Sequence, residues 1–259
     1  MFKQVFKDIH SHKDLILHLT MTDFKNNTAR TYLGFLWWIL DPILYMGIFY
    51  LLVQVILQRG GPDYSVYLFT GLIPLKWATA CIVDSTNSIA SNARIIQQVY
   101  VPKVVFISVR LLVNTFKFLI SAVVLFLFLW LYGIDLNLNA LQFIPIMIVN
   151  ALFLFSIMTF LAHIGVFIRD VKNAMQYIAR ILLYLSPVLF SLDQVPEKYV
   201  PILLLNPLST LLTSYRDVLL YGRSPDWSHL IVLLLISFVL LFLGLRVIMK
   251  NEKEYAKVI

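Results

Sequence analysis

Long apolar stretches dominate the sequence and set its class of fold. A bilayer span needs about 20 mostly apolar residues, because the hydrocarbon core is about 30 Å thick and a helix rises about 1.5 Å per residue. Five stretches meet this requirement directly: residues 35–57, 104–131, 141–167, 174–191 and 228–249. A sixth, residues 64–83, is long enough although Pro74 and Lys76 interrupt it. We therefore predict an all-α membrane protein with six transmembrane helices.

The composition agrees with this class. Of the 259 residues, 60% are hydrophobic and 14% are charged, whereas a soluble domain has about 45–50% apolar and about 25% charged residues. The single cysteine, Cys81, excludes an internal disulfide and a thiolate metal cluster. A net charge of +7 could indicate a nucleic-acid partner. The positions of the cations relative to the predicted spans favour a membrane protein instead.

The distribution of Lys and Arg predicts the orientation of the chain. Thirteen lie in segments on the side of the two termini, and four lie on the other side: Arg59, Lys198, Arg216 and Arg223. By the positive-inside rule both termini are expected in the cytoplasm.

The first 30 residues have the pattern of a surface helix. Phe2, Val5, Phe6 and Ile9 recur at helical spacing among basic residues, which predicts an amphipathic helix lying at the membrane interface. A plain solvated arm before the first span is the alternative.

Residues 84–103 are too polar to cross a bilayer, yet Ile89, Ile96 and Tyr100 follow helical spacing. We predict a short cytoplasmic helix whose apolar stripe packs against a partner; the alternative is that it packs against the inner face of its own chain. On the outer side, the apolar run 200–212 is too short to span and is interrupted by proline. This pattern predicts a re-entrant or interfacial hairpin within residues 192–222.

Ionisable residues inside spans are functional candidates, because they are costly in a membrane. Four cations lie within the predicted spans: Lys76, Arg110, Lys117 and Arg180. Asp41 and Lys76 lie about 9–10 Å from the inner ends of neighbouring spans at about 1.5 Å per residue, which predicts an ion pair between them. Arg180 can extend to the cytoplasmic interface.

Arg110, Asn114 and Lys117 share one face of the span 104–131 because they are four and three residues apart. We expect no carboxylate beside them, so the stripe suits a conduit for an anionic cargo. The alternative is that these side chains satisfy polar groups of neighbouring spans.

Enzyme motifs are absent from the sequence. It contains no G-x-x-x-x-G-K-[ST] phosphate loop, no H-E-x-x-H, no G-x-S-x-G and no D-x-D pair. We therefore predict no catalytic residue and no metal site, and a structural polar contact for His163. Asp193 and Glu197 are the modest candidates for the alternative, a membrane-embedded glycosyl- or phosphotransferase.

Motifs spread along the chain carry a family resemblance. They are L-G-F-L-W at 33–37 followed by Pro42, G-L-I-P at 71–74, Ser91-Asn92 with Val101-Pro102, F-I-R-D-V at 167–171, S-P-V at 186–188, L-N-P-L at 205–208 and Y-R-D at 215–217. In this order and spacing the chain resembles the transmembrane subunit of ABC exporters for lipid-linked bacterial polysaccharides, namely O-antigen, capsule and wall teichoic acid permeases.

The resemblance implies a single transmembrane domain, residues 1–259, that acts as a transport subunit in the bacterial plasma membrane. It implies a homodimer joined to two copies of a separate ATP-binding cassette subunit, which would bind ATP and Mg²⁺, so that this chain itself binds no cofactor. Its other partners would be membrane lipids and an undecaprenyl-diphosphate-linked polymer, with no nucleic acid.

The resemblance also implies roles for residues. The helix in 84–103 and the turn at 168–173 would couple to the ATPase through Asn92, Arg94, Gln97, Tyr100, Pro102, Arg169 and Asp170. The external gate would comprise Pro187, Asn206, Pro207, Tyr215 and Arg216. The substrate pathway that we expect comprises Lys25, Arg30, Lys76, Arg110, Asn114 and Lys117. Where the family often has an Arg-Tyr pair before L-G, this chain has Asn27-Thr28, so Lys25 or Arg30 is the expected contact to the diphosphate.

The excess of cations inside the spans favours a polyanionic cargo, and thus teichoic acid. O-antigen or capsular polysaccharide is the alternative with the same architecture, and a drug or lipid efflux permease is a further one.

Overall fold

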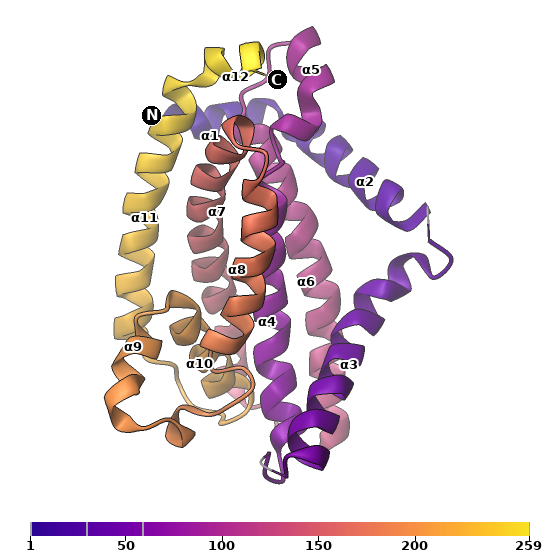
Figure 1. The fold of residues 1–259 in the computed structure, drawn as a ribbon, viewed down its shortest axis with the longest axis vertical. Coiled ribbons are helices and arrows are strands. Elements are labelled where there is room, and N and C mark those ends of the chain that lie inside the picture. The colour runs from indigo at the N-terminus through magenta and orange to yellow at the C-terminus, as the bar shows by residue number, and fades with distance from the viewer. Residues whose placement is uncertain (1, 30, 59, 259) are drawn as a thin grey trace.

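The computed structural model describes residues 2–29, 31–58 and 60–258 of the chain (Figure 1). Every regular element within these ranges is a helix, and none of the residues described forms a strand. The all-α class predicted from the sequence is therefore confirmed. The long helices run side by side as an elongated bundle, and short helices lie across one of its ends (Figure 1).

Five helical segments in the described ranges are long and apolar enough to cross a membrane. They are α3 (Trp37–Tyr50) with the turns η1 (Gly34–Leu36) and η2 (Leu51–Ile56), α4 (Tyr64–Ser85), α6 (Val104–Tyr132), α7 (Phe143–Phe167) with the turn η4 (Leu138–Gln142), and α11 (Trp227–Lys250). They coincide with five of the six predicted spans, so the chain is a multi-pass membrane protein.

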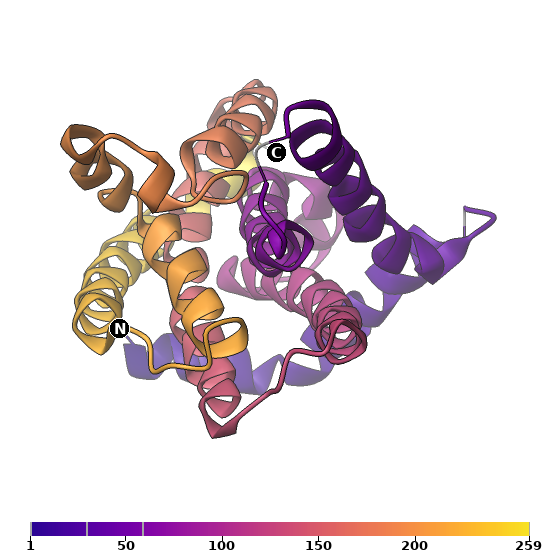
Figure 2. The ribbon, with the colours of Figure 1, turned by 90° about the horizontal axis from the view of Figure 1, so that it is seen from below.

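Helix α4 forms the centre of the bundle. It packs against α3, α6, α7, α8 and α10, and other helices surround it when the bundle is seen along its axis (Figure 2). Its sequence is apolar on all sides, and a helix of this kind is stable only where every face is covered. Leu68, Phe69 and Leu72 are accordingly almost fully buried. By contrast, only 11% of the apolar window of α3 is buried, so α3 lies at the periphery.

The predicted span 174–191 is shorter in the structure. Helix α8 (Val171–Leu185) has 15 residues, which at about 1.5 Å per residue gives about 22 Å, less than the hydrocarbon core of about 30 Å. The helix ends at Ser186, whose backbone is extended, because a residue before proline is disfavoured in the helical region. Thus α8 packs along α4 and α7 without the length of a full span.

Residues 192–222 contain two helices rather than one simple hairpin. After the short turns η5 (Leu192–Gln194) and η6 (Glu197–Tyr199), α9 (Val200–Leu204) has no buried residue, whereas α10 (Pro207–Leu219) buries most of its side chains. Asn206 begins α10, since its side chain accepts a hydrogen bond from Leu208 N at 3.1 Å. Helix α10 packs against α4 and α7, at the end of the bundle opposite the termini (Figure 1).

The other end of the bundle holds both ends of the chain together with α1 (Phe2–Ser11), α2 (Lys13–Ala29), α5 (Ala93–Gln98) and α12 (Glu252–Val258) (Figure 1). The predicted N-terminal helix is therefore two helices. Val5 is buried against Val104 of α6 and the end of α11, with Ile9 beside it, while Phe6 remains 74% exposed. The predicted apolar face thus packs in part on the chain's own bundle.

Candidate functional site

The expected contact between the first two predicted spans is present. Lys76 of α4 forms an ion pair with Asp41 of α3, and its Nζ lies 3.5 Å from the centroid of the Tyr45 ring. The prediction is confirmed because α3 and α4 are packed neighbours that carry these residues at matching depth.

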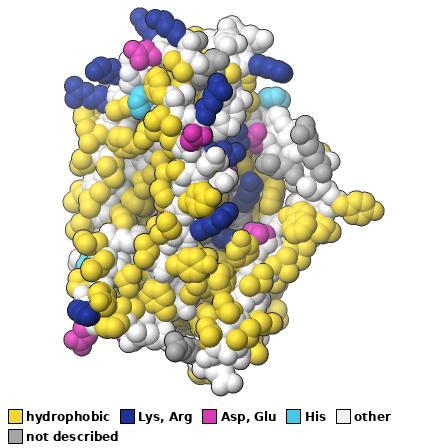
Figure 3. Space-filling model, in the orientation of Figure 1, with side chains coloured by type: hydrophobic (Ala, Val, Ile, Leu, Met, Phe, Trp, Pro, Cys, Tyr) yellow, Lys and Arg dark blue, Asp and Glu magenta, His cyan; other side chains and the backbone are white. Residues whose placement is uncertain are grey.

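Beside this ion pair, α3, α4 and α6 enclose a cavity of about 360 Å³. Its polar lining comes from all three helices: Asp41, Lys76, Asn114, Lys117 and Ser121. In the view of Figure 3, Lys and Arg side chains lie one above another down the middle of the molecule, among hydrophobic side chains. Three residues of the expected pathway, Lys76, Asn114 and Lys117, therefore share one cavity.

Aromatic side chains form the other walls of this cavity: Trp37, Trp38, Trp77 and Phe118. Trp77 stacks on Phe118 with ring centroids 4.3 Å apart, which fixes the inner wall. Lys117 Nζ lies 5.9 Å from the Trp38 ring, within the range of a cation–π contact. Among the residues described, no carboxylate lies within ion-pair distance of Lys117.

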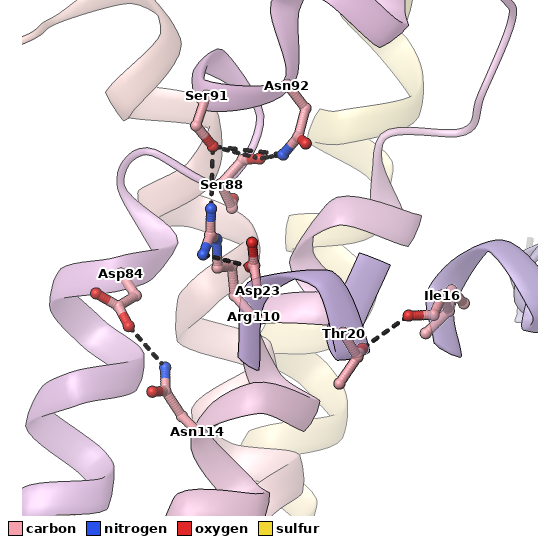
Figure 4. A network of polar contacts seen from close by, with 9 residues as sticks. All are labelled: Ile16, Thr20, Asp23, Asp84, Ser88, Ser91, Asn92, Arg110 and Asn114. Atoms are coloured by element: carbon pink, nitrogen blue, oxygen red, sulfur yellow. Dashed lines mark hydrogen bonds and ion pairs between the residues drawn. The ribbon is translucent and has the colours of Figure 1, made fainter. Parts of the chain in front are cut away.

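The predicted cationic stripe is divided, and the expectation that no carboxylate lies beside it is wrong. Arg110 forms an ion pair with Asp23 of α2 at 2.7 Å and donates to Ser91 Oγ at 3.2 Å. Asn114 Nδ2 donates to Asp84 Oδ2 at 3.0 Å (Figure 4). Asp23 lies beside Arg110 because α2 packs across α6, which the span pattern alone does not reveal, and Asp84 lies beside Asn114 because α4 packs against α6. Arg110 therefore ties α2 to α6 and does not line the cavity.

The N-terminal residues expected at the pathway are not brought into the cavity. Lys25 is exposed on α2, and it is not among the cavity's lining residues. Arg30 lies outside the described residues.

The residues expected to contact an ATPase lie at the end of the bundle that holds the termini. Arg94, Gln97 and Tyr100 are exposed on and after α5, whereas Pro102 is buried. Asn92 faces inward and donates to Ser88 O at 2.8 Å (Figure 4). Arg169 and Asp170 are exposed in the turn between α7 and α8.

The apolar stripe predicted in 84–103 is only partly free. Ile89 is fully buried and Ile96 is 6% exposed within the chain's own core, while Tyr100 is 75% exposed. Most of the stripe therefore packs on its own bundle, which is the alternative considered from the sequence.

A second cavity, of about 660 Å³, lies between α5 and α12. Lys103 lines it, is 3% exposed and donates to Val101 O at 3.1 Å. Burial lowers the pKa of Lys103, and the negative charge of Glu252 opposes this shift. Residues of the segment after α5 and of the C-terminal helix thus line one cavity, with the buried cation Lys103 among them.

The residues expected at the external gate meet around α10. Arg216 is 2% exposed, and its guanidinium donates to the carbonyls of Tyr67, Pro187 and Val188. Asn206 Nδ2 donates to Ser186 Oγ at 3.0 Å. The Ser186–Val188 turn that ends α8 is therefore held by both ends of the 206–216 segment.

Tyr215 and Pro207, which were also expected at the external gate, both lie on α10. Tyr215 is fully buried and its hydroxyl accepts from Asn150 Nδ2 at 3.5 Å. Pro207 occupies the first turn of α10, where its missing N–H has no helical partner to lose.

Two residues of these clusters, Asp23 and Tyr67, were not identified from the sequence, and Gly71 was identified only as part of the G-L-I-P motif. A Cβ on Gly71 would lie 2.4 Å from Arg216 Nη2, so the glycine makes room for the guanidinium on α4. The ring of Tyr67, one turn earlier on α4, lies 3.5 Å beneath the guanidinium carbon. The G-L-I-P motif did not reveal the role of Gly71, since Arg216, the partner of this glycine, is 145 residues away.

His163 of α7 makes the structural polar contact predicted for it. Its Nδ1 lies 2.7 Å from the hydroxyl of Tyr255, which is fully buried on α12. Burial together with Glu252 and Glu254 raises the pKa of Tyr255, so the phenol stays protonated and available as a donor.

Known proteins similar to this chain are export permeases. Two O-antigen export system permease proteins RfbA of Klebsiella pneumoniae are 27% and 28% identical to it over 247 residues, which is 95% of this chain and 95% of each of them. The RfbA protein of Myxococcus xanthus is 24% identical over 256 residues, 98% of both chains. No family model matches the sequence.

A further similar protein is named for the transport of polysialic acid. The polysialic acid transport protein KpsM of Escherichia coli is 24% identical over 238 residues, 91% of this chain and 92% of that protein. Over most of its length, therefore, this chain has as its homologues the permeases of ABC polysaccharide exporters, as the motif pattern predicts.

Proposed function

We propose that this chain is the membrane-spanning subunit of an ATP-driven exporter that moves O-antigen or capsular polysaccharide, linked to a polyprenyl diphosphate, across the bacterial plasma membrane. The observation that carries the proposal is the similarity to export permeases over at least 91% of the chain. The arrangement of a polar cavity inside the bundle, with exposed polar segments at the end that holds the termini, supports it.

The cargo proposed here replaces the teichoic acid expected from the sequence. That expectation depended on an excess of cations inside the spans, and two of these cations have carboxylate partners: Lys76 pairs with Asp41 and Arg110 with Asp23. The similar proteins are named for O-antigen and polysialic acid. Both observations favour the alternative cargo.

ATP and Mg²⁺ would be bound by a separate partner subunit, because the sequence lacks a phosphate loop. The partner would contact the exposed side chains of α5 and the α7–α8 turn, including Arg94, Gln97 and Arg169. Closure of the ATPase would press on α5, and the buried Ile89 and Ile96 would transmit the force to the bundle.

Six crossings, with α8 and residues 186–190 as the fifth, would place both termini in the cytoplasm and residues 192–222 at the outer surface. This topology agrees with the thirteen Lys and Arg on the side of the termini and with the position of both ends of the chain at one end of the bundle (Figure 1). In this topology α9 and α10 form the re-entrant segment, and Arg216 holds the external gate closed.

A second copy of the chain would complete the conduit. Helix α3 buries only 11% of its apolar window, and α8 has no buried residue, so both offer apolar faces to a partner in the membrane. The polymer would pass between the two copies.

Affinity purification from the native membrane tests the partnership. The tagged chain should recover a stoichiometric subunit with a phosphate-loop ATPase domain. The Arg94→Glu variant should lose that subunit, because it reverses a charge on the exposed face of α5. A matched variant, Lys198→Glu, reverses an exposed charge at the opposite end of the bundle and should retain the subunit.

Recovery of no ATPase under detergent conditions that preserve the oligomer would contradict the proposed function. Full retention by Arg94→Glu would contradict the contact at α5 alone.

A further inference from the structure

Two of the side chains that line the cavity between α3, α4 and α6 carry buried polar atoms without partners. Trp77 is 3% exposed and Asn114 is 1% exposed. Neither Trp77 Nε1, a donor, nor Asn114 Oδ1, an acceptor, has a hydrogen-bond partner among the described residues. Buried polar groups are almost always hydrogen-bonded in folded proteins, so an unpaired donor and an unpaired acceptor on two lining side chains favour a polar ligand at this wall.

The charged residues of the cavity favour an anion. Its lining has two cations, Lys76 and Lys117, and one anion, Asp41, which leaves a net charge of +1 (two minus one). The ion pair with Asp41 neutralises the charge of Lys76. Lys117 is the group left to balance a negative charge supplied by a ligand, and a cation without a counter-charge is unfavourable in a membrane.

The cavity lies at mid-height of the bundle. Lys117 is the fourteenth of the 29 residues of α6, about 20 Å along a helix of about 43 Å at about 1.5 Å per residue. A lipid headgroup normally lies at the bilayer surface, so an anionic site at mid-height suits a headgroup that is crossing. The opening exists because the wall formed by α3 is incomplete: the Asp41 side chain is 54% exposed.

We propose that this cavity binds the phosphate-bearing headgroup of a lipid within a single copy of the chain, halfway across the bilayer. Lys117 binds the phosphate oxygens and Trp77 Nε1 donates a hydrogen bond to them. Asn114 Oδ1 accepts from a hydroxyl of the attached group, and the aromatic walls at Trp37 and Trp38 cover its apolar part. Where the lipid is the anchor of the exported polymer, the inference rests on the proposed function; where it is a bilayer phospholipid, it does not.

Lipid binding to the purified chain in a nonionic detergent tests the inference by native mass spectrometry. Two matched pairs of probes are titrated: undecaprenyl phosphate against undecaprenol, and phosphatidylglycerol against diacylglycerol. Each pair differs in its phosphate-bearing headgroup. The phosphate-bearing member of at least one pair should bind about tenfold more tightly than its neutral partner, which corresponds to one charge-assisted hydrogen bond.

Variants assign that preference to the cavity. Lys117→Met should abolish the tenfold preference, Lys117→Arg should restore most of it, and Trp77→Phe should reduce it about threefold while keeping the stacked ring. Lys172→Met, which removes an exposed cation of α8, is the matched control and should bind as the parent does. Equal thermal stability of the four variants in detergent shows that binding, and not folding, has changed.

The two lipid sources are distinguished by which pair shows the preference. A preference for undecaprenyl phosphate identifies the polymer's anchor, and a preference for phosphatidylglycerol identifies a bilayer lipid; either supports the site. Neutral probes that bind as tightly as their phosphates, or a Lys117→Met variant that binds as the parent does, would overturn it. A Lys117-dependent preference in a chain that recovers no ATPase would leave the site intact and contradict the exporter instead.

Discussion

Arg216 is held without a carboxylate among the residues described, and its neighbourhood shows why particular residue types occur around it. Its guanidinium donates to three backbone carbonyls and to the Tyr67 hydroxyl at 2.9 Å. Arginine suits this position because its planar fork presents five donors in fixed directions. Lysine could not reach three separate carbonyls, so the position depends on the shape of the side chain as well as its charge.

Gly71→Ala should destabilise the protein because the new Cβ would lie 2.4 Å from Arg216 Nη2. Moving the guanidinium breaks its hydrogen bonds, at a cost of about 1–3 kcal/mol. Thermal unfolding in detergent should show a lower midpoint. Gly47→Ala in α3 is the control, since nothing lies within 4 Å of its added methyl group; equal midpoints for the two variants would refute this role of Gly71.

The Asp41–Lys76 pair should behave as a coupled unit in a double-mutant cycle. Asp41→Asn and Lys76→Met each leave one partner unpaired, whereas the double variant removes both charges. Their effects on the unfolding midpoint should therefore be non-additive, with a coupling of about 0.5–3 kcal/mol. Additive effects of the two substitutions would show that the ion pair contributes nothing to the fold.

For individual residues, the sequence predicts contacts between consecutive spans better than contacts between distant segments. Asp41 and Lys76 were paired by depth because they lie on neighbouring helices. Arg110 was expected to be unpaired, and Asp23 was missed, because pairing them requires knowing that α2 crosses α6. The partners of Arg216 were missed for the same reason, since Tyr67 is 149 residues from it.

The helix ends at the terminal side of the bundle are connected through α12. Tyr255 packs edge-on against His163 with ring centroids 5.8 Å apart and also contacts Phe167. Because α12 packs against both α5 and α7, this seven-residue helix links the segment proposed to couple with the ATPase to a long helix of the bundle. From the sequence, the residues of α12 contributed only to the count of Lys and Arg on the side of the termini.

Tyr255→Phe should loosen this connection, because it removes the hydrogen bond to His163 and leaves the ring in place. The net loss is about 0.5–1.5 kcal/mol, and it should appear as faster amide hydrogen exchange in α12 and α5. Tyr199→Phe is the control, because Tyr199 is 47% exposed beside Lys198. Unchanged exchange in α5 would show that α12 does not support it.

The length of a helix follows from the sequence where its apolar run is uninterrupted, as in α6 and α11. Proline explains the main departure: Pro187 ends α8 early, so that the apolar residues after Leu185 form a turn instead of a further helical turn. Pro74, in contrast, lies inside α4 without ending it, since the packed neighbours of α4 hold the helix together. The low helix propensity of proline alone does not predict that Pro187 ends a helix while Pro74 does not.

The whole molecule combines a bundle with distinct ends. One end holds the termini, α5 and α12, and the other holds α9 and α10 (Figure 1). Both ends of the chain lie at the same end of the bundle (Figure 1), whereas the cytoplasmic location that the charge distribution predicts for them stays a prediction. The similar permeases cover nearly the whole chain. The mid-height cavity could not be predicted from the sequence, because it depends on how three helices leave space between them.

Cysteine accessibility tests the six-crossing topology. In a Cys81→Ala background, which removes a fully buried thiol, single cysteines replace Arg94, Leu138 and Lys198. An impermeant maleimide added to intact cells should label the cysteines at 138 and 198 but not at 94. Protection at 198 together with labelling at 138 would show that α8 does not cross the membrane.

Transport into inverted membrane vesicles tests the central claim most directly. Their cytoplasmic face is outward, so exported polysaccharide enters the lumen and becomes protected from an added glycosidase. We predict ATP-dependent protection of labelled, lipid-linked polysaccharide in vesicles that contain the chain and its ATPase partner, and none in vesicles from cells that lack the chain. Equal ATP-dependent protection in both preparations would contradict the assignment of this chain as the export permease.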